Sequence, residues 1–227
     1  MIKVLSVGGS IIAPGGVDTE FLKKFVSLVR KFLNDNPDAK LILVVGGGAP
    51  ARVYQAAYRD LVPSGDQNES DWIGIMATRL NARLLKAVFA DLCPQDVVCD
   101  PTVCDVFQGR ILVAAGWKPG FSTDNDAVLL AEKFGSNLVV NLSNIKQVYT
   151  DDPKKNPDAK PIDKISWAEF RKIIGDEWSP GKNVPFDPVA SRRAQEKGIS
   201  VICAGGTDID NIEKILNDKD FFGTLIF

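Results

Sequence analysis

The chain has 227 residues, 45% of them hydrophobic and 25% charged, and its formal net charge is −2 at pH 7. This composition is typical of a globular protein of one large or two small domains, and it excludes an overall basic field that would hold nucleic acid or an anionic membrane. The sequence contains no histidine, which rules out Ser-His-Asp and Cys-His catalysis and a Cys/His zinc site.

Apolar runs without alternation predict strands that are buried on both faces, as in a parallel sheet. These runs cover residues 2–7, 40–45, 110–115, 137–142 and 199–204. Helical patterns lie between them, at residues 18–33, 49–60, 71–92, 124–134, 166–174, 187–197 and 208–217. Strands and helices that alternate in this way predict a three-layer α/β/α sandwich with a mainly parallel central sheet.

Residues 146–165 form the most polar segment of the chain. We expect a short excursion from a single domain, in which the VYT and KPI stretches pair as a small hairpin. The final residues, FFGTLIF, predict a last strand at the edge of the sheet.

Targeting and redox signals are not recognisable in the sequence. The chain starts with a short strand-like run rather than a signal peptide, and no apolar run approaches about 18 residues. The four cysteines, Cys93, Cys99, Cys104 and Cys203, form no C-x-x-C pair. We therefore expect a cytoplasmic protein with buried or incidental thiols and no metal-ligating side chains.

Three glycine-containing turns each follow a predicted strand. They are VGGS at 7–10, VVGGGAPAR at 44–52 and GWKPGFSTDND at 116–126. Glycine lets the backbone approach a phosphate closely, and a following helix adds unpaired N–H groups and about half a positive charge. Because parallel strands share their carboxyl ends, the turns are expected to meet at one sheet edge. Together they predict an anion site, with Thr123 serving both as helix start and as part of the wall.

The kind of anion stays open at this point. No segment matches the G-x-x-x-x-G-K-[ST] phosphate loop. Gly46, Gly48 and Ala51 match the dinucleotide-binding pattern G-x-G-x-x-[GA], which also needs an acidic residue about 20 positions on, at the end of a strand. Glu69 and Asp71 open a helix instead. Dinucleotide binding is therefore a distant alternative, which binding of NAD would revive.

These turns and three further segments, taken in order, resemble the amino acid kinase superfamily. The further segments are DWIGIMATRLNA at 71–82, SNIKQVYTDDPKKNPDAKPI at 143–162 and WSPGKNVPFDPVA at 178–190. The resemblance covers nearly the whole chain and is strongest to uridylate (UMP) kinases of the shorter archaeal type. It implies phosphoryl transfer from ATP to UMP, with Mg²⁺ as cofactor, giving ADP and UDP in pyrimidine nucleotide biosynthesis.

The resemblance also implies an assignment of residues within one domain, 1–227. Roughly residues 1–135 would bind the acceptor, and roughly residues 136–227 would bind ATP. The ATP-binding set would be Gly9, Ser10, Gly48, Arg52, Ser143, Asn144, Tyr149 and Asp152. The UMP-binding set would be Gly47, Asp71, Trp117, Lys118, Pro119, Gly120, Phe121, Ser122 and Thr123. Such kinases are typically hexamers, trimers of dimers packed partly through the early helices, so a homo-oligomer is expected.

The residues themselves are compatible with a phosphate acceptor. A phosphate monoester has a second pKa near 6 and is already a nucleophile at pH 7, so it needs no histidine base. Positioning and charge neutralisation then dominate, because two like unit charges about 4 Å apart repel by about 4 kcal/mol at an effective dielectric constant near 20. We expect Arg52 and Asp124 to be catalytic, Arg52 as a fixed cation and Asp124 by orienting lysines or holding Mg²⁺ through water. Lys118 could contact a phosphate.

Three positions depart from the family pattern. Many members carry a lysine where this chain has Ser6, and Lys146-Gln147 replaces an Asp-Gly pair. Which cation replaces the lysine is open, and Lys146 could itself reach a phosphate. The departures keep open a non-catalytic ATP- and oxyanion-binding storage protein of the same superfamily. A kinase of another small phosphate or carboxylate acceptor is a separate alternative.

Overall fold

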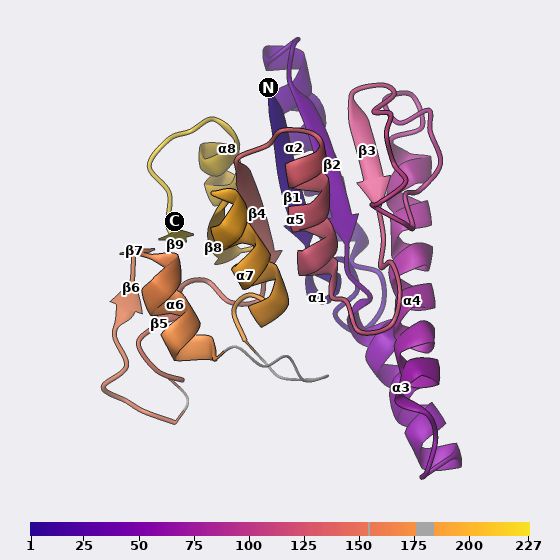
Figure 1. Ribbon diagram of the computed structural model, residues 1–227. Coiled ribbons are helices and arrows are strands. Elements are labelled where there is room, and N and C mark those ends of the chain that lie inside the picture. The colour runs from indigo at the N-terminus through magenta and orange to yellow at the C-terminus, as the bar shows by residue number, and fades with distance from the viewer. Residues whose placement is uncertain (154, 176–183) are drawn as a thin grey trace.

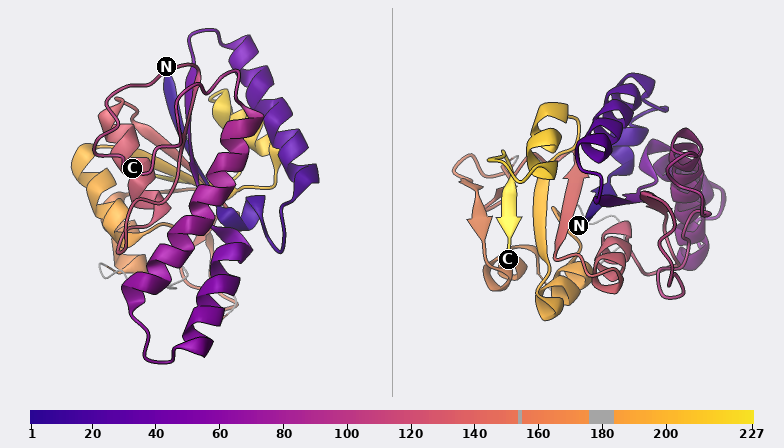
Figure 2. Two further views of the ribbon diagram at one scale, coloured as in Figure 1. Left: turned by 90° about the vertical axis from the view of Figure 1, so that its right-hand side faces the viewer. Right: turned by 90° about the horizontal axis from the view of Figure 1, so that it is seen from above.

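In the computed structural model, which describes residues 1–153, 155–175 and 184–227, a mainly parallel sheet lies between two layers of helices (Figures 1 and 2). Its centre consists of β1 (Ile2–Val7), β2 (Lys40–Val45), β3 (Ile111–Ala114), β4 (Leu138–Ser143) and β8 (Ser200–Gly205). These strands lie in the order β3-β2-β1-β4-β8 and pair in parallel. The expected sandwich and its five strands are confirmed.

The far edge of the sheet differs from the prediction. β9 (Thr224–Ile226) pairs antiparallel with β8, but β7 (Lys164–Ile165) pairs with its other side and forms the edge. The prediction that the final strand is the edge was wrong, because the end of the polar segment returns to the sheet. The predicted hairpin is confirmed: β5 (Val148–Tyr149) pairs antiparallel with β6 (Pro161–Ile162).

Helices fill the connections between strands. They are α1 (Gly9–Ile12), α2 (Thr19–Asp35), α3 (Gly48–Leu61), α4 (Gln67–Val88), α5 (Thr123–Lys133), α6 (Trp167–Ile174), α7 (Pro188–Lys197) and α8 (Ile209–Leu216). The single turn of α1 was not predicted. α4 begins earlier than the expected residue 71, because the side chain of Asp66 accepts a hydrogen bond from Asn68 N at 2.9 Å and caps it there.

Alternating side chains of the central strands enter two separate cores. Leu5 and Leu43 face one side, which α2, α4 and α8 cover, and Val4 and Ile42 face the other, which α5, α6 and α7 cover. Figure 2, right, shows these layers above and below the sheet. With both faces buried, the strands need the unbroken apolar runs that identify them in the sequence.

α3 and α4 run side by side and extend past the carboxyl ends of the strands (Figure 2, left). Large apolar side chains are exposed on this helix pair, among them Val53, Tyr54, Leu61, Met76 and Leu80. Within the part of the chain that the structure describes, no helix is long and apolar enough to cross a membrane.

Candidate active site

The three glycine-containing turns meet, as expected, at the carboxyl ends of the parallel strands. They enclose a cleft of about 290 Å³, here called the glycine cleft. Its lining residues are Ser6, Gly8, Gly9, Ser10, Gly46, Gly47, Gly48, Arg52, Thr123, Asp124, Asn141, Ser143, Asn144, Ile145, Val184 and Pro185. They come from the ends of β1, β2 and β4, the starts of α1, α3 and α5, and the chain before α7.

Backbone packs directly on backbone at the floor of this cleft. A Cβ atom on Gly9 would overlap the backbone of Gly46, Gly47 and Gly48. Gly48 also has a φ of 67°, in the left-handed region that glycine adopts without strain. The glycines therefore bring the turns after β1 and β2 into contact, and this contact fixes their relative position.

Asp124 is the carboxylate that lines the glycine cleft among the described residues. Its Oδ1 accepts a hydrogen bond from Ser6 Oγ at 3.0 Å, and its Oδ2 accepts one from Asp187 N at 3.3 Å. Burial, together with the charge of nearby Asp187, raises the pKa of Asp124 to about 7. Ser6 supplies a hydroxyl where a lysine would supply a charge, so it leaves this carboxylate without a cation from β1.

Two further carboxyl groups lie beside Asp124. Asp187 caps α7 by accepting a hydrogen bond from Ala190 N at 2.7 Å, and burial raises its pKa. Asp126 is fully buried, and burial raises its pKa to about 7, although its Oδ2 accepts a hydrogen bond from Trp117 N at 3.1 Å. The start of α5 thus concentrates carboxyl groups that ionise with difficulty.

The start of α5 is capped by Ser122 rather than Thr123. The Ser122 hydroxyl accepts a hydrogen bond from Asn125 N at 3.2 Å. Thr123 is the first residue of the helix and lines the glycine cleft. Thr123 therefore starts the helix and contributes to the wall, as expected, and the cap itself is Ser122, which has the extended backbone conformation of a cap.

The turn before α5, residues 117–122, is here called the acceptor turn. Gly120 N donates a hydrogen bond to Asp71 Oδ2 at 3.2 Å, which ties the turn to the first part of α4. The rings of Trp117 and Phe121 lie 5.0 Å apart, and the Lys118 ammonium lies 3.9 Å from the centre of the Trp117 ring. These ring and cation contacts join side chains at the two ends of the acceptor turn.

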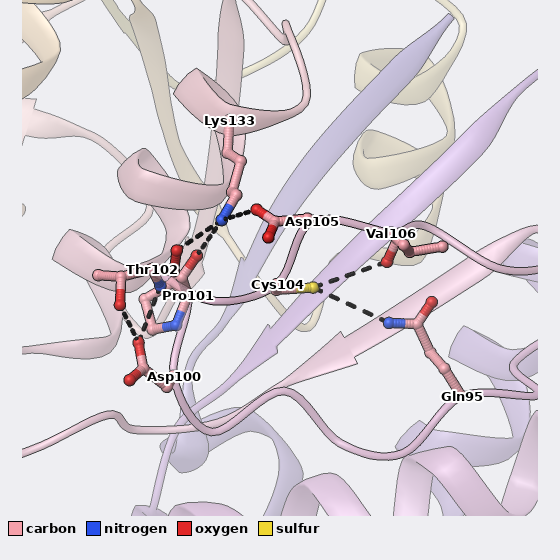
Figure 3. Close-up of polar contacts among 8 residues, drawn as sticks. All are labelled: Gln95, Asp100, Pro101, Thr102, Cys104, Asp105, Val106 and Lys133. Carbon is pink, nitrogen blue, oxygen red and sulfur yellow. Dashed lines mark hydrogen bonds and ion pairs between the residues drawn. The ribbon is translucent and has the colours of Figure 1, made fainter.

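The loop between α4 and β3 supports the acceptor turn from outside. Lys133 of α5 donates to the carbonyl of Thr102 at 2.6 Å and pairs with Asp105 at 2.6 Å, which fixes this loop (Figure 3). Asp100 accepts hydrogen bonds from the hydroxyl and from the N–H of Thr102, at 2.6 Å and 2.8 Å, and the hydroxyl contributes most to lowering the pKa of Asp100. The Asp100 carboxylate also interacts with the side chain of Trp117, which links this loop to the acceptor turn.

The structure brings together part of the predicted residue set. Gly9, Ser10, Gly47, Gly48, Arg52, Thr123, Asp124, Ser143 and Asn144 line the glycine cleft. Asp71, Trp117, Lys118, Pro119, Gly120, Phe121 and Ser122 lie in or against the acceptor turn, outside the lining. Tyr149 and Asp152 belong to the β5–β6 excursion and also lie outside it. Of the WSPGKNVPFDPVA segment, residues 178–183 fall outside the described residues.

Several site residues were missed by sequence reasoning. Asn141 lines the glycine cleft and donates a hydrogen bond to Pro185 O at 2.8 Å. A polar residue inside the apolar run NLVVNL was the available signal, because a buried amide needs a partner. Thr78, Arg79 and Asn81 also contact the turns, although their motif served only to support the family resemblance.

Magnesium fits the donor set of the glycine cleft. Mg²⁺ in kinase sites is held by one or two carboxylates, waters and the substrate's own phosphates. Asp124 supplies one carboxylate there, and the described residues contain no group of three or more acidic, cysteine or histidine side chains that would hold a metal by itself. Asp124 would thus hold Mg²⁺ together with a phosphate-bearing substrate.

Comparison with known proteins agrees with this geometry. Residues 1–205 match the amino acid kinase family, and the chain belongs to that family. It is 35% identical to a uridylate kinase of Methanospirillum hungatei over 98% of this chain and 93% of the relative. It is also 34% identical to a uridylate kinase of Pyrococcus abyssi over 95% of each. The crystal structure of uridylate kinase from Archaeoglobus fulgidus matches with a TM-score of 0.84 and 32% identity over all of both chains.

Proposed function

We propose that this protein is a UMP kinase, which transfers the γ-phosphoryl group of ATP to UMP and gives ADP and UDP. The observation that carries the proposal is the junction at the start of α5. There Thr123 and Asp124 line the glycine cleft directly after the acceptor turn. A donor phosphate in the cleft and an acceptor phosphate beside the turn would thus be neighbours. The similarity to proteins named uridylate kinase supports this choice of acceptor.

ATP would place its phosphates on the glycine cleft. Gly9, Ser10 and Gly48 offer backbone at close range, and the exposed Arg52 lies one turn into α3. The positive ends of the α3 and α5 helix dipoles add partial positive charge. Ser143 and Asn144 would complete this site, with Tyr149 and Asp152 on the nucleoside side.

UMP would lie between the acceptor turn and the start of α4, where Asp71 and Gly47 would contact it. Its phosphate needs no protein base, because the dianion is already nucleophilic at pH 7. The residues therefore act by orienting the two substrates and by reducing their mutual repulsion. Mg²⁺ bound with ATP would neutralise part of the phosphate charge, and Asp124 would help to hold it.

The exposed surface of α3 and α4 supports the proposal of a homo-oligomer. Val53, Tyr54, Leu61, Met76 and Leu80 are between 58% and 79% exposed on neighbouring helices. Grouped apolar side chains of this size are typical of interfaces. We expect a second copy of the chain to cover them, within a cytoplasmic hexamer built from dimers.

A coupled ADP-release assay with Mg-ATP and, separately, UMP, CMP, AMP and dUMP tests the proposed function. We expect turnover with UMP to exceed the others and to fall by about a hundredfold in Arg52→Ala, the effect of removing one charged phosphate contact. Arg59→Ala, an exposed arginine at the other end of α3, is the matched control and should keep wild-type activity. ATP binding without turnover of any acceptor would overturn the proposal and favour a storage protein.

A further inference from the structure

One turn of α4 contacts both the glycine cleft and the root of the acceptor turn. Its three polar residues, Thr78, Arg79 and Asn81, are here called the α4 clamp. They lie on a helix whose other polar residues mostly face solvent, yet Thr78 and Asn81 are 8% and 3% exposed. Buried polar side chains of this kind are retained where their hydrogen bonds fix a local arrangement.

Asn81 holds the glycine-cleft side. Its amide Nδ2 donates to the carbonyl of Gly46 at 2.9 Å and to the carbonyl of Gly47 at 3.1 Å. A Cβ on Gly47 would lie 3.2 Å from Gly74 O, so α4 also packs closely against this turn. The turn after β2 is therefore held at two successive peptide groups by one side chain.

Thr78 and Arg79 hold the acceptor side. Thr78 Oγ1 accepts a hydrogen bond from Gly116 N at 2.8 Å and donates to Ile75 O at 2.6 Å. Arg79 donates from Nε to Gly116 O at 3.4 Å and from Nη2 to Trp117 O at 3.0 Å. The Gly116–Trp117 backbone is thus bound from α4 at one N–H and two carbonyl groups.

The guanidinium of Arg79 is directed at the protein backbone. Besides the two carbonyls, it lies 5.5 Å above the ring of Trp72, a cation–π contact that fixes its plane. Each carbonyl contact is a hydrogen bond from a charged donor, which is stronger than one between neutral groups. Arg79 therefore acts on the substrate through the turn that it holds.

We propose that the α4 clamp is a positioning device that sets the distance between the donor phosphate site and the acceptor site. The inference rests on the proposed function for its kinetic consequence. Phosphoryl transfer depends on placing two phosphates in line, and a shift of about 1 Å can cost about a hundredfold in rate. The two turns follow different strands, and α4 hydrogen-bonds to both of them.

Steady-state kinetics separates the two ends of the clamp. Arg79→Met keeps the length of the side chain and removes its donors, and we expect the KM for UMP to rise about tenfold with the KM for ATP within about twofold. Arg79→Lys, with one donor group, should restore part of the loss. Asn81→Ala should mainly lower kcat. Arg83→Ala, on the next turn of α4 with only an exposed ion pair to Asp96, should behave like wild type.

Hydrogen exchange in the ligand-free protein supplies a measurement independent of activity. Arg79→Met should speed exchange of the amides in residues 115–121, and Asn81→Ala should speed exchange in residues 45–49, with Arg83→Ala unchanged. Unchanged exchange at 115–121 in Arg79→Met would overturn the inference and indicate direct contact with substrate. A wild-type protein inactive on every acceptor would sink the proposed function alone, since the exchange result stands without it.

Discussion

The glycine cleft and the acceptor turn lie next to each other but are held in place differently. In the glycine cleft, Gly9 packs against Gly46–Gly48, so main chain fixes main chain. The acceptor turn depends on side chains from other elements: Arg79 and Asp71 of α4 and Asp126 of α5. A single added Cβ atom is enough to disrupt a contact between backbones. Replacing one side chain removes only that side chain's contact and leaves the others.

The largest effect is expected from Gly9→Ala. The added methyl group would overlap the backbone of Gly46–Gly48, which cannot move aside as a flexible side chain could. We expect the free energy of unfolding to fall by about 3 kcal/mol or more, with loss of ATP binding. Urea unfolding and ATP titration measure the two effects.

Gly15→Ala is the control for this prediction. A Cβ at Gly15 has no neighbour within 4 Å, and its φ is not positive. Gly15→Ala should therefore leave the free energy of unfolding and the affinity for ATP unchanged. A Gly9→Ala variant that binds ATP normally would contradict the view that backbone contact fixes the glycine cleft.

A second prediction concerns the pH dependence of activity. The pKa of Asp124 is raised to about 7, so this carboxyl group is largely protonated below that pH. If ionised Asp124 holds Mg²⁺ and orients ATP, kcat/KM for ATP should rise about tenfold per pH unit below about 7 and level off above it. Ser6→Lys would place a cation beside Asp124 and should shift the rise to lower pH. Asp124→Asn should abolish the rise together with most of the activity.

The central strands of the sheet could be predicted from the sequence, because each is an unbroken apolar run. The meeting of the glycine-containing turns could also be predicted, because parallel strands end at the same edge of the sheet. The edge position of β7 was not predictable from two residues, Lys164 and Ile165, since it depends on where the chain returns after the β5–β6 excursion. The carboxyl groups of Asp126 and Asp187 were also missed. Their raised pKa values arise mainly from burial, which is not a local property of the sequence.

A third prediction concerns stability and involves Asp126. Its pKa is about 7 in the folded protein against an ordinary 3.8, so between these values the folded state binds more protons than the unfolded state. The free energy of unfolding should therefore fall as pH rises through this window, by about 1.4 kcal/mol per pH unit from this residue. Asp126→Asn keeps an acceptor for Trp117 N and should flatten the fall.

Urea unfolding at about pH 5 and about pH 8 measures this slope. Asp124 and Asp187 have pKa shifts of the same sign, so part of the fall should persist in Asp126→Asn. Stability that rises with pH in the wild type would contradict the prediction, because it would mean that a carboxyl group with a lowered pKa dominates.

The smallest effect is expected from Lys118, which sequence reasoning placed near a phosphate. Its ammonium lies 3.9 Å from the Trp117 ring centre and 5.2 Å from that of Phe121, and such exposed contacts are worth about 0.5–1 kcal/mol. Lys118→Met should therefore raise the KM for UMP about two- to fivefold with little change in kcat, and Lys118→Arg, which keeps the cation–π contact, should leave both unchanged. A fall in kcat of more than about tenfold in Lys118→Met would instead mean that the side chain leaves the rings to reach the transferred phosphoryl group. In that case the acceptor turn would rearrange during turnover. It would then differ from the glycine cleft in its mobility as well as in the contacts that hold it.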